Sequence, residues 1–442
     1  MTERKAPKRI AAAVINSLKG GVVPRIGLPY ITVGRKNEIA ALLNDVEIIS
    51  EGGASCRFIV GKYGSGKSFM LQTIRTYVMD RNFVVADADL SPERRLQGSH
   101  GQGLATYREL IRNLSTRTRP EGGALMLVMD RWVQALNQEI RNETGLQEND
   151  PAFAEAAYQK LNQMTHAMNE LVHGYDFASV LKIYYSAVME EDEEKKALAV
   201  KWLRGEYNTR TEAKNELNVR SIISDDDWYD YLKLFAAFLK HAGYSGMMIL
   251  IDELVNIYKI PNSITRQYNY EKILTMYNDT MQGKAQYLGI LMSGTPQAVE
   301  DRRRGIYSYE ALRSRLAEGR FARQGTRDML APVIHLEPLS AEEMLVLVGK
   351  LAELHERLYD YECRLTDEDY AAFIRIEYGR IGADSAITPR EVIRDFIELL
   401  DILYQHPETD LEALLQSDEF TYAKSLLEAQ DEPDAQFAEF RL

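Results

Sequence analysis

The sequence predicts an α/β domain built on a doubly wound parallel sheet, and the pattern of apolar runs is the first reason. Five short runs rich in apolar residues are separated by segments with helical spacing. Continuous apolar runs of this length are typical of parallel strands that are buried on both faces. The predicted strands are 58–60, 83–89, 247–251, 287–292 and 333–336.

The second observation behind the predicted fold is a long helical stretch between the second and third predicted strands. Residues 91–242 contain few strand signals, and segments such as 153–171 and 229–239 have helical spacing. We interpret this stretch as a large helical insertion within the α/β domain. From residue 340 onward the sequence is helical again.

A chain of 442 residues exceeds one ordinary core, so several subdomains are expected. The core is predicted to combine residues 51–90 with residues 243–339. An N-terminal helical segment, 1–50, precedes the core, and residues 91–242 form the insertion. Residues 340–442 are expected to form a C-terminal helical lid that ends in an acidic tail.

A phosphate-binding loop follows the first predicted strand. Residues 61–68 read GKYGSGKS, a complete Walker A pattern, and helix-like sequence follows it. Glycines let the backbone curl so that N–H groups face a phosphate, and the following helix N-terminus favours negative charge. This strand–loop–helix context predicts a P-loop NTPase. The residues expected to bind ATP here are Gly61, Lys62, Tyr63, Gly64, Ser65, Gly66, Lys67, Ser68 and Phe69.

Two of these residues have specific expected roles. Lys67 should reach the β- and γ-phosphates, and the hydroxyl of Ser68 should ligate Mg²⁺. ATP and Mg²⁺ are therefore the predicted cofactors.

A Walker B pattern ends the third predicted strand. The run MMILI at 247–251 is followed by Asp252 and Glu253. Parallel sheets place ligand-binding groups at the carboxyl ends of their strands. Asp252 is expected to hold Mg²⁺, mostly through water, and Glu253 to polarise the attacking water as the catalytic base.

The order of these motifs resembles that of P-loop ATPases of the AAA+ and STAND group, especially relatives of the origin-recognition ATPases. The resemblance implies a strand order of 5-1-4-3-2 and further site residues. Arg35, in a GRxxE-like box, would help to hold the adenine, which places segment 1–50 on the adenine side. Ser293 and Thr295 stand where sensor 1 is expected. Arg313 or Arg315 would act as an arginine finger, and Arg390 as sensor 2.

Three further segments, which are less specific than the nucleotide motifs, indicate a smaller group of related proteins. They are residues 21–25, 201–206 and 243–246. With the Walker A loop they resemble the ATP-binding proteins of bacterial antiphage defence systems, of which the BREX proteins are the general relatives. The Shango ATPase component is the nearest match we suggest. That system implies a TerB-like protein and a helicase as partners. No winged-helix domain follows the lid, which argues against direct binding of duplex DNA.

Composition limits the other function classes. The net charge is −13, whereas proteins that coat nucleic acid by charge alone are usually basic. Two cysteines exclude a disulfide framework and a Cys₄ zinc site. No apolar run approaches the length of a membrane span, and the first residues lead into no signal-peptide core, so we expect a cytoplasmic protein without membrane contact.

The sequence therefore predicts an ATPase that is slow without its partners and acts as a conformational or assembly switch in an antiphage defence complex. A homo-oligomer or the partner proteins would complete the site. Two alternatives stay open. One is a non-hydrolysing scaffold that ATP holds together, and intact Glu253 argues against it. The other is a DNA-dependent motor or loader. The run Arg302, Arg303, Arg304 and the basic N-terminal arm favour it, whereas the low pI and the missing winged helix disfavour it.

Overall fold

The computed structural model describes residues 6–169, 171–317, 319, 327–380 and 388–415. Its contacts divide the chain into two compact units. The sheet unit comprises Lys36–Lys62 and Lys67–Leu336. The helical unit comprises the described residues within 1–35, 63–66 and 337–442. Tyr63–Gly66 of the Walker A segment belong to the helical unit.

The sheet unit contains five parallel strands in the order β2-β3-β4-β1-β5. Read from the other edge, this is 5-1-4-3-2, the predicted order. The P-loop strand β1 is therefore interior, between β4 and β5. The strands are β1 (Ala54–Val60), β2 (Phe83–Asp89), β3 (Gly246–Asp252), β4 (Leu288–Gly294) and β5 (Val333–His335).

The strand predictions are confirmed in number and place, with shifted ends. β1 begins four residues before the predicted start, because Ala54 already pairs with Leu288 of β4. β4 begins one residue later than predicted. Tyr287 has a φ of 53°, a left-handed conformation that does not continue a strand.

Both faces of the sheet are buried, as a doubly wound fold requires. One face, with Ile59, Val85 and Leu250, packs with residues of α3 and α4. The other face, with Phe58, Ala86 and Ile249, packs into a larger core with residues of α5, α6, α11 and α13. The helices on the first face are α3 (Lys36–Ser50) and α4 (Lys67–Asp80).

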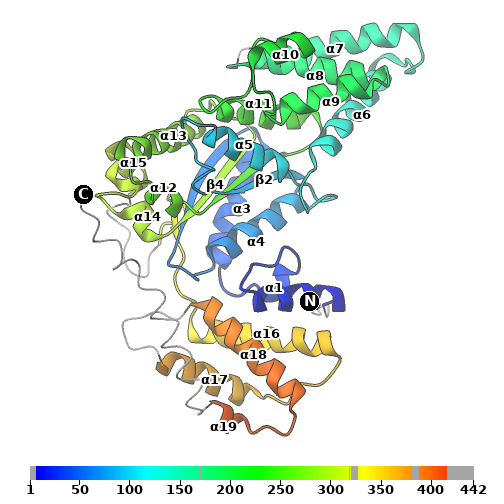
Figure 1. Cartoon of the computed structure of the whole chain (residues 1–442). Helices are drawn as coiled ribbons and strands as arrows, with labels where there is room; N and C mark the ends of the chain where they lie inside the picture. The colour runs from blue at the N-terminus through cyan, green and yellow to red at the C-terminus, as the bar shows by residue number, and fades with distance from the viewer. Residues whose placement is uncertain (1–5, 170, 318, 320–326, 381–387, 416–442) are drawn as a thin grey trace. The chain divides into compact units, whose positions relative to one another are not determined.

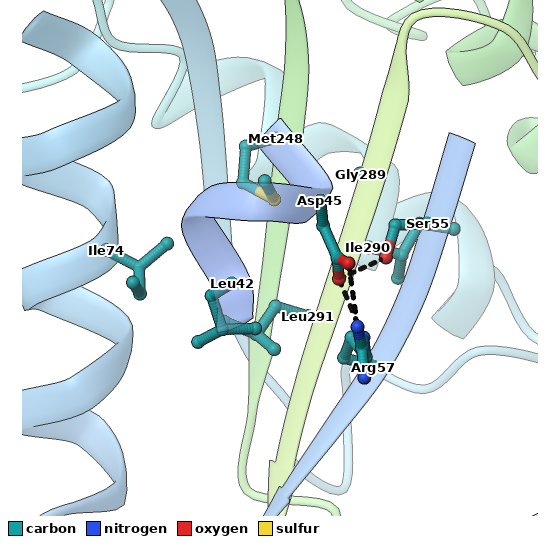
Figure 2. A pocket seen from close by; sticks show the side chains of 9 residues that line it. All are labelled: Leu42, Asp45, Ser55, Arg57, Ile74, Met248, Gly289, Ile290 and Leu291. Atoms are coloured by element: carbon teal, nitrogen blue, oxygen red, sulfur yellow. Dashed lines mark hydrogen bonds and ion pairs between the residues drawn. The ribbon is translucent and has the colours of Figure 1, made fainter. Parts of the chain in front are cut away.

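A buried ion pair fixes α3 to the strand that leads into the P-loop (Figure 2). The Nε and Nη2 atoms of Arg57 on β1 each donate to a carboxylate oxygen of Asp45 at 2.7 Å. The hydroxyl of Ser55 donates to the same carboxylate. Arg57 is only 8% exposed. Because removing one partner would leave an unpaired buried charge, this pair fixes the position of α3 against β1.

Helices occupy the chain between β2 and β3. The three tryptophans of the protein lie in them and are fully buried: Trp132, Trp202 and Trp228. Trp132 packs edge-on against Phe238 at 5.2 Å between ring centroids. The helices are α5 (Gln102–Arg112), α6 (Leu125–Thr144), α7 (Pro151–Asn169), α8 (Gly174–Met189), α9 (Glu193–Leu203), α10 (Arg210–Leu217) and α11 (Trp228–His241).

Short elements follow β3 and β4. α12 (Val255–Tyr258) comes directly after the Walker B strand, and the long helix α13 (Ser263–Met281) leads to β4. The elements after β4 are α14 (Pro296–Glu300), the 3₁₀ turn η1 (Ile306–Ser308) and α15 (Glu310–Leu316).

In the helical unit the N-terminal helix packs with helices from the far end of the chain (Figure 1). Lys19 of α1 pairs with Asp401 of α18, and Arg357 of α16 donates to the carbonyl of Ala6 at 3.1 Å. Of the predicted segment 1–50, the described residues up to 35 belong to this unit and α3 belongs to the sheet unit. The helices here are α1 (Lys8–Lys19), α2 (Leu28–Ile31), α16 (Ala341–Tyr359), α17 (Asp367–Arg380), α18 (Pro389–Gln405) and α19 (Leu411–Leu415). Within the described ranges, every helix is too short or too polar to cross a bilayer.

Candidate nucleotide-binding site

The Walker A residues connect β1 to α4 through a tightly curled loop. Gly64 and Gly66 have φ values of 72° and 91°, which residues with a Cβ rarely adopt. α4 begins at Lys67, so its unpaired first amides and the positive end of its dipole follow the loop directly. This is the local geometry that binds phosphate groups.

Lys67 is held by the start of the same loop. Its Nζ atom donates to the carbonyl oxygens of Gly61 at 3.0 Å and Lys62 at 2.9 Å. Partial burial lowers the pKa of Lys67, while the carboxylates of Asp252 and Glu253 act in the opposite direction. The ammonium group therefore stands near the end of β3.

The carboxylate of Asp252 joins the two Walker motifs. Ser68 Oγ donates to Asp252 Oδ2 at 2.5 Å. The other oxygen, Oδ1, accepts from the backbone N–H of Glu253 at 2.8 Å and from the hydroxyl of Ser293. Asp252 is 8% exposed, so these donors fix a nearly buried carboxylate at the carboxyl end of β3.

Glu253 has a strained backbone conformation for its residue type. Its φ is 63°, and such outliers in non-glycine residues are often associated with functional sites. The left-handed turn ends β3, and the N–H of Leu254 then donates to the carbonyl of Ser293 at 3.0 Å. Burial, followed by the charge of Asp252, raises the pKa of Glu253, which suits a carboxylate that accepts a proton.

These residues fit Mg²⁺ and a nucleotide phosphate. A hydroxyl beside a carboxylate supplies the few protein ligands that Mg²⁺ uses when substrate phosphates and water complete its shell. Among the residues that the structure describes, no group of three or more His, Cys, Asp or Glu side chains forms a separate metal site. The buried hydroxyl of Ser65, within the loop, has no hydrogen-bond partner in the described part of the chain.

Comparison with known families agrees with this geometry. Over residues 6–419 the chain matches the family described as BREX system ATP-binding protein BrxC/D. The chain belongs to this family. The predicted resemblance to BREX ATP-binding proteins is thereby confirmed, and membership indicates an ATP-binding role in phage defence. No curated protein matches the chain.

The two residues predicted to form sensor 1 in this BREX-family protein, Ser293 and Thr295, both make hydrogen bonds within the sheet unit. Ser293 on β4 is fully buried, and its hydroxyl is bonded to Asp252. The hydroxyl of Thr295 accepts from the N–H of Ala298 at 3.2 Å and caps α14. A direct contact of either residue with the γ-phosphate stays a prediction.

The two candidates for the arginine finger, Arg313 and Arg315, lie on α15. Arg313 pairs with Glu310 at 3.2 Å, and Arg315 donates to Asn278 Oδ1 at 3.0 Å. Nearby, Arg304 donates to the carbonyl of Tyr258 at 2.8 Å, so this member of the 302–304 run supports the end of α12. The action of Arg313 or Arg315 in trans stays a prediction.

Arg35 and Arg390 both bind backbone carbonyls within the helical unit. Arg390 Nη2 donates to the carbonyl of Gly21 at 2.8 Å. Arg35 Nη2 donates to the carbonyls of Glu337 at 2.7 Å and Ser65 at 3.3 Å. Their expected contacts with the nucleotide stay predictions, and the carbonyl of Ser65 ties Arg35 to the phosphate-binding loop.

Asp89, at the end of β2, is a further carboxylate near the site that the sequence motifs do not include. Asp89 is in register with Asp252 on the neighbouring strand. Burial and the charge of Asp252 raise its pKa, and its own charge helps to raise the pKa of Glu253. The sequence could have indicated this carboxylate, because Asp89 ends the second predicted strand and parallel strands end at the same edge of a sheet.

Proposed function

We propose that this protein binds Mg·ATP beside Lys67, Ser68 and Asp252, hydrolyses it slowly, and uses its nucleotide state as a conformational or assembly switch in an antiphage defence complex. The observation that best supports this is the 2.5 Å contact between Ser68 and Asp252. It joins two motifs that are 184 residues apart in the sequence.

Each residue of the site has a chemical task under this proposal. Lys67 stabilises the negative charge of the transferred phosphoryl group. Ser68 and Asp252 hold Mg²⁺, which neutralises phosphate charge when it is bound. Glu253 accepts the proton of the attacking water as the water oxygen bonds to the γ-phosphorus and ADP leaves. The raised pKa of Glu253 makes its carboxylate a better proton acceptor than an ordinary one.

A second candidate function is a DNA-dependent motor or loader. The exposed side chains of Arg302 and Arg303 favour it, because exposed cations can contact DNA phosphates. Arg304 differs from them, since it donates to the carbonyl of Tyr258. The net charge of −13 disfavours it. Duplex DNA would then stimulate hydrolysis, and the stimulation would fall steeply with salt concentration.

Phosphate release from Mg·ATP tests the main proposal. We expect slow turnover by the wild-type protein, a loss of turnover in Glu253→Gln, and no stimulation by duplex DNA at low or high salt. Turnover equal in the two proteins would overturn the proposal. DNA stimulation that disappears with salt would favour the motor instead.

The partners are part of the same proposal. We expect a TerB-like protein and a helicase, as in a Shango-type system, to raise the turnover. Adding the two products of the neighbouring genes to the phosphate-release assay tests this, and unchanged turnover would argue against it.

A further inference from the structure

Arg35 lies at a turn with a demanding backbone conformation. Gly34 and Arg35 have φ values of 64° and 61°, so two consecutive residues are left-handed. This conformation is unfavourable for an arginine and persists only where the surroundings hold it. The contacts that stabilise this backbone conformation therefore indicate the role of the Arg35 side chain.

The segment that carries Arg35 is fixed against α16. A Cβ added to Gly34 would lie 2.5 Å from Glu343 Oε1, so the Glu343 side chain would have to move to make room for it. Two residues earlier, the carbonyl of Thr32 accepts from Lys350 Nζ at 3.0 Å. Glu343 is itself fixed, because it forms the capping box of α16 with Ser340.

The side chain of Arg35 donates to two backbone carbonyls through one nitrogen atom. Its Nη2 atom lies 2.7 Å from the carbonyl oxygen of Glu337 and 3.3 Å from that of Ser65. A guanidinium Nη carries two hydrogens, so one is available for each acceptor. The side chain thereby connects the phosphate-binding loop to the chain that leads into α16.

The contact with Ser65 determines the direction of the next amide. The Ser65 carbonyl and the Gly66 N–H belong to one peptide unit, and the described peptide bonds are all trans. In a trans peptide the C=O and N–H bonds point to opposite sides. With its carbonyl bonded to Arg35, this peptide turns the Gly66 N–H away from Arg35, and that N–H has no acceptor among the described residues.

We infer that Arg35 is a positioning residue for the phosphate-binding loop. It holds the Ser65–Gly66 peptide so that the Gly66 N–H faces the β- and γ-phosphates. The inference rests on the proposed function, since it assumes that the loop binds a nucleotide. It assigns Arg35 to the phosphates, whereas the GRxxE-like resemblance implies contact with the adenine.

Binding of three magnesium complexes separates these roles. The probes are ATP, GTP and inorganic tripolyphosphate, which share a triphosphate and differ in the base. We expect Arg35→Ala to weaken all three by a similar factor, about 3- to 10-fold, because one hydrogen bond to the loop is lost. Arg35→Lys should recover part of the affinity, since an ammonium group still donates to the Ser65 carbonyl.

Lys350→Ala is the matched control. It removes a cation that holds the same segment at Thr32 without contact to Ser65. We expect it to leave the three affinities close to wild type. An equal loss in Lys350→Ala and Arg35→Ala would overturn the inference and assign the effect to general loosening of the segment.

Two further results bear on the inference. A loss of ATP affinity alone in Arg35→Ala, with a changed ATP-to-GTP ratio, would overturn it in favour of adenine contact. ATP binding by the wild-type protein that Lys67→Ala weakens by about 10-fold or more supports the proposed function by itself. With that result in hand, unchanged affinities in Arg35→Ala overturn only the role of Arg35.

Discussion

Ser68 Oγ and Asp252 Oδ2 lie 2.5 Å apart, although 184 residues separate them in the chain. The helical insertion accounts for most of that separation. Because β1 and β3 both pair with β4 in parallel, the loop after β1 and the end of β3 meet at the same edge of the sheet.

Asp252→Asn should remove the magnesium dependence of ATP binding. The amide keeps the shape of the side chain but loses the charge that attracts Mg²⁺ and presents a nitrogen to one of the two serine hydroxyls. Titration with a fluorescent ATP analogue, with and without Mg²⁺, checks this. Equal magnesium enhancement in wild type and variant would contradict the assignment of Asp252.

Lys67→Ala should weaken ATP binding by about 10- to 100-fold, because hydrogen bonds to charged groups contribute about 1.5–3 kcal/mol. Lys62→Ala is the control in the same loop: Lys62 is expected to bind ATP through its backbone, which alanine keeps, and its side chain is exposed. Equilibrium titration compares the two variants. Wild-type affinity in Lys67→Ala would show that this loop is not the nucleotide site.

Glu253→Gln should keep ATP binding but lose turnover by roughly 100-fold or more, because an amide does not accept a proton as a carboxylate does. Single-turnover phosphate release measures the chemical step directly. The matched variant is Glu300→Gln, a carboxylate that pairs with His335 at 2.5 Å. Turnover at the wild-type rate in Glu253→Gln would contradict its role as the base.

Glu253→Gln should also raise the thermal stability of the nucleotide-free protein at neutral pH. Burial and Asp252 raise the folded-state pKa of Glu253, so its ionised form destabilises the fold. This penalty is complete above the folded-state pKa. It disappears as the pH falls below the ordinary carboxylate pKa, where both states are protonated. Melting curves of wild type and variant should therefore converge in acid, and a constant difference would contradict the electrostatic cause.

Arg313 and Arg315 should act on a neighbouring subunit. An Arg313→Ala/Arg315→Ala double variant should lose turnover, since arginine fingers contribute about 10³–10⁵ in rate. Mixing it with Glu253→Gln protein should restore part of the activity, because one mixed interface keeps a complete site. Arg302→Ala is the control, an exposed arginine of the same region. Turnover per subunit that is independent of concentration and unchanged in the double variant would indicate a monomeric enzyme.

The amino-acid sequence by itself determined the five strands and predicted the chemistry of the candidate site. Apolar runs predicted the five strands because strands buried on both faces contain little else. The Walker A pattern identified Lys67 and Ser68 because their spacing from the glycines is fixed by the loop itself. Family membership confirmed the predicted relation to BREX ATP-binding proteins.

Only the tertiary structure decided which distant groups meet. The N-terminal helix α1 packs with α16 and α18 through contacts such as Lys19 with Asp401, and no local periodicity encodes such a partner. The sequence also could not predict which carbonyls Arg35 and Arg390 bind. Every residue has a carbonyl, and the fold alone determines which one lies within reach. Local patterns specify what each segment is, whereas the contacts between segments depend on the folded chain as a whole.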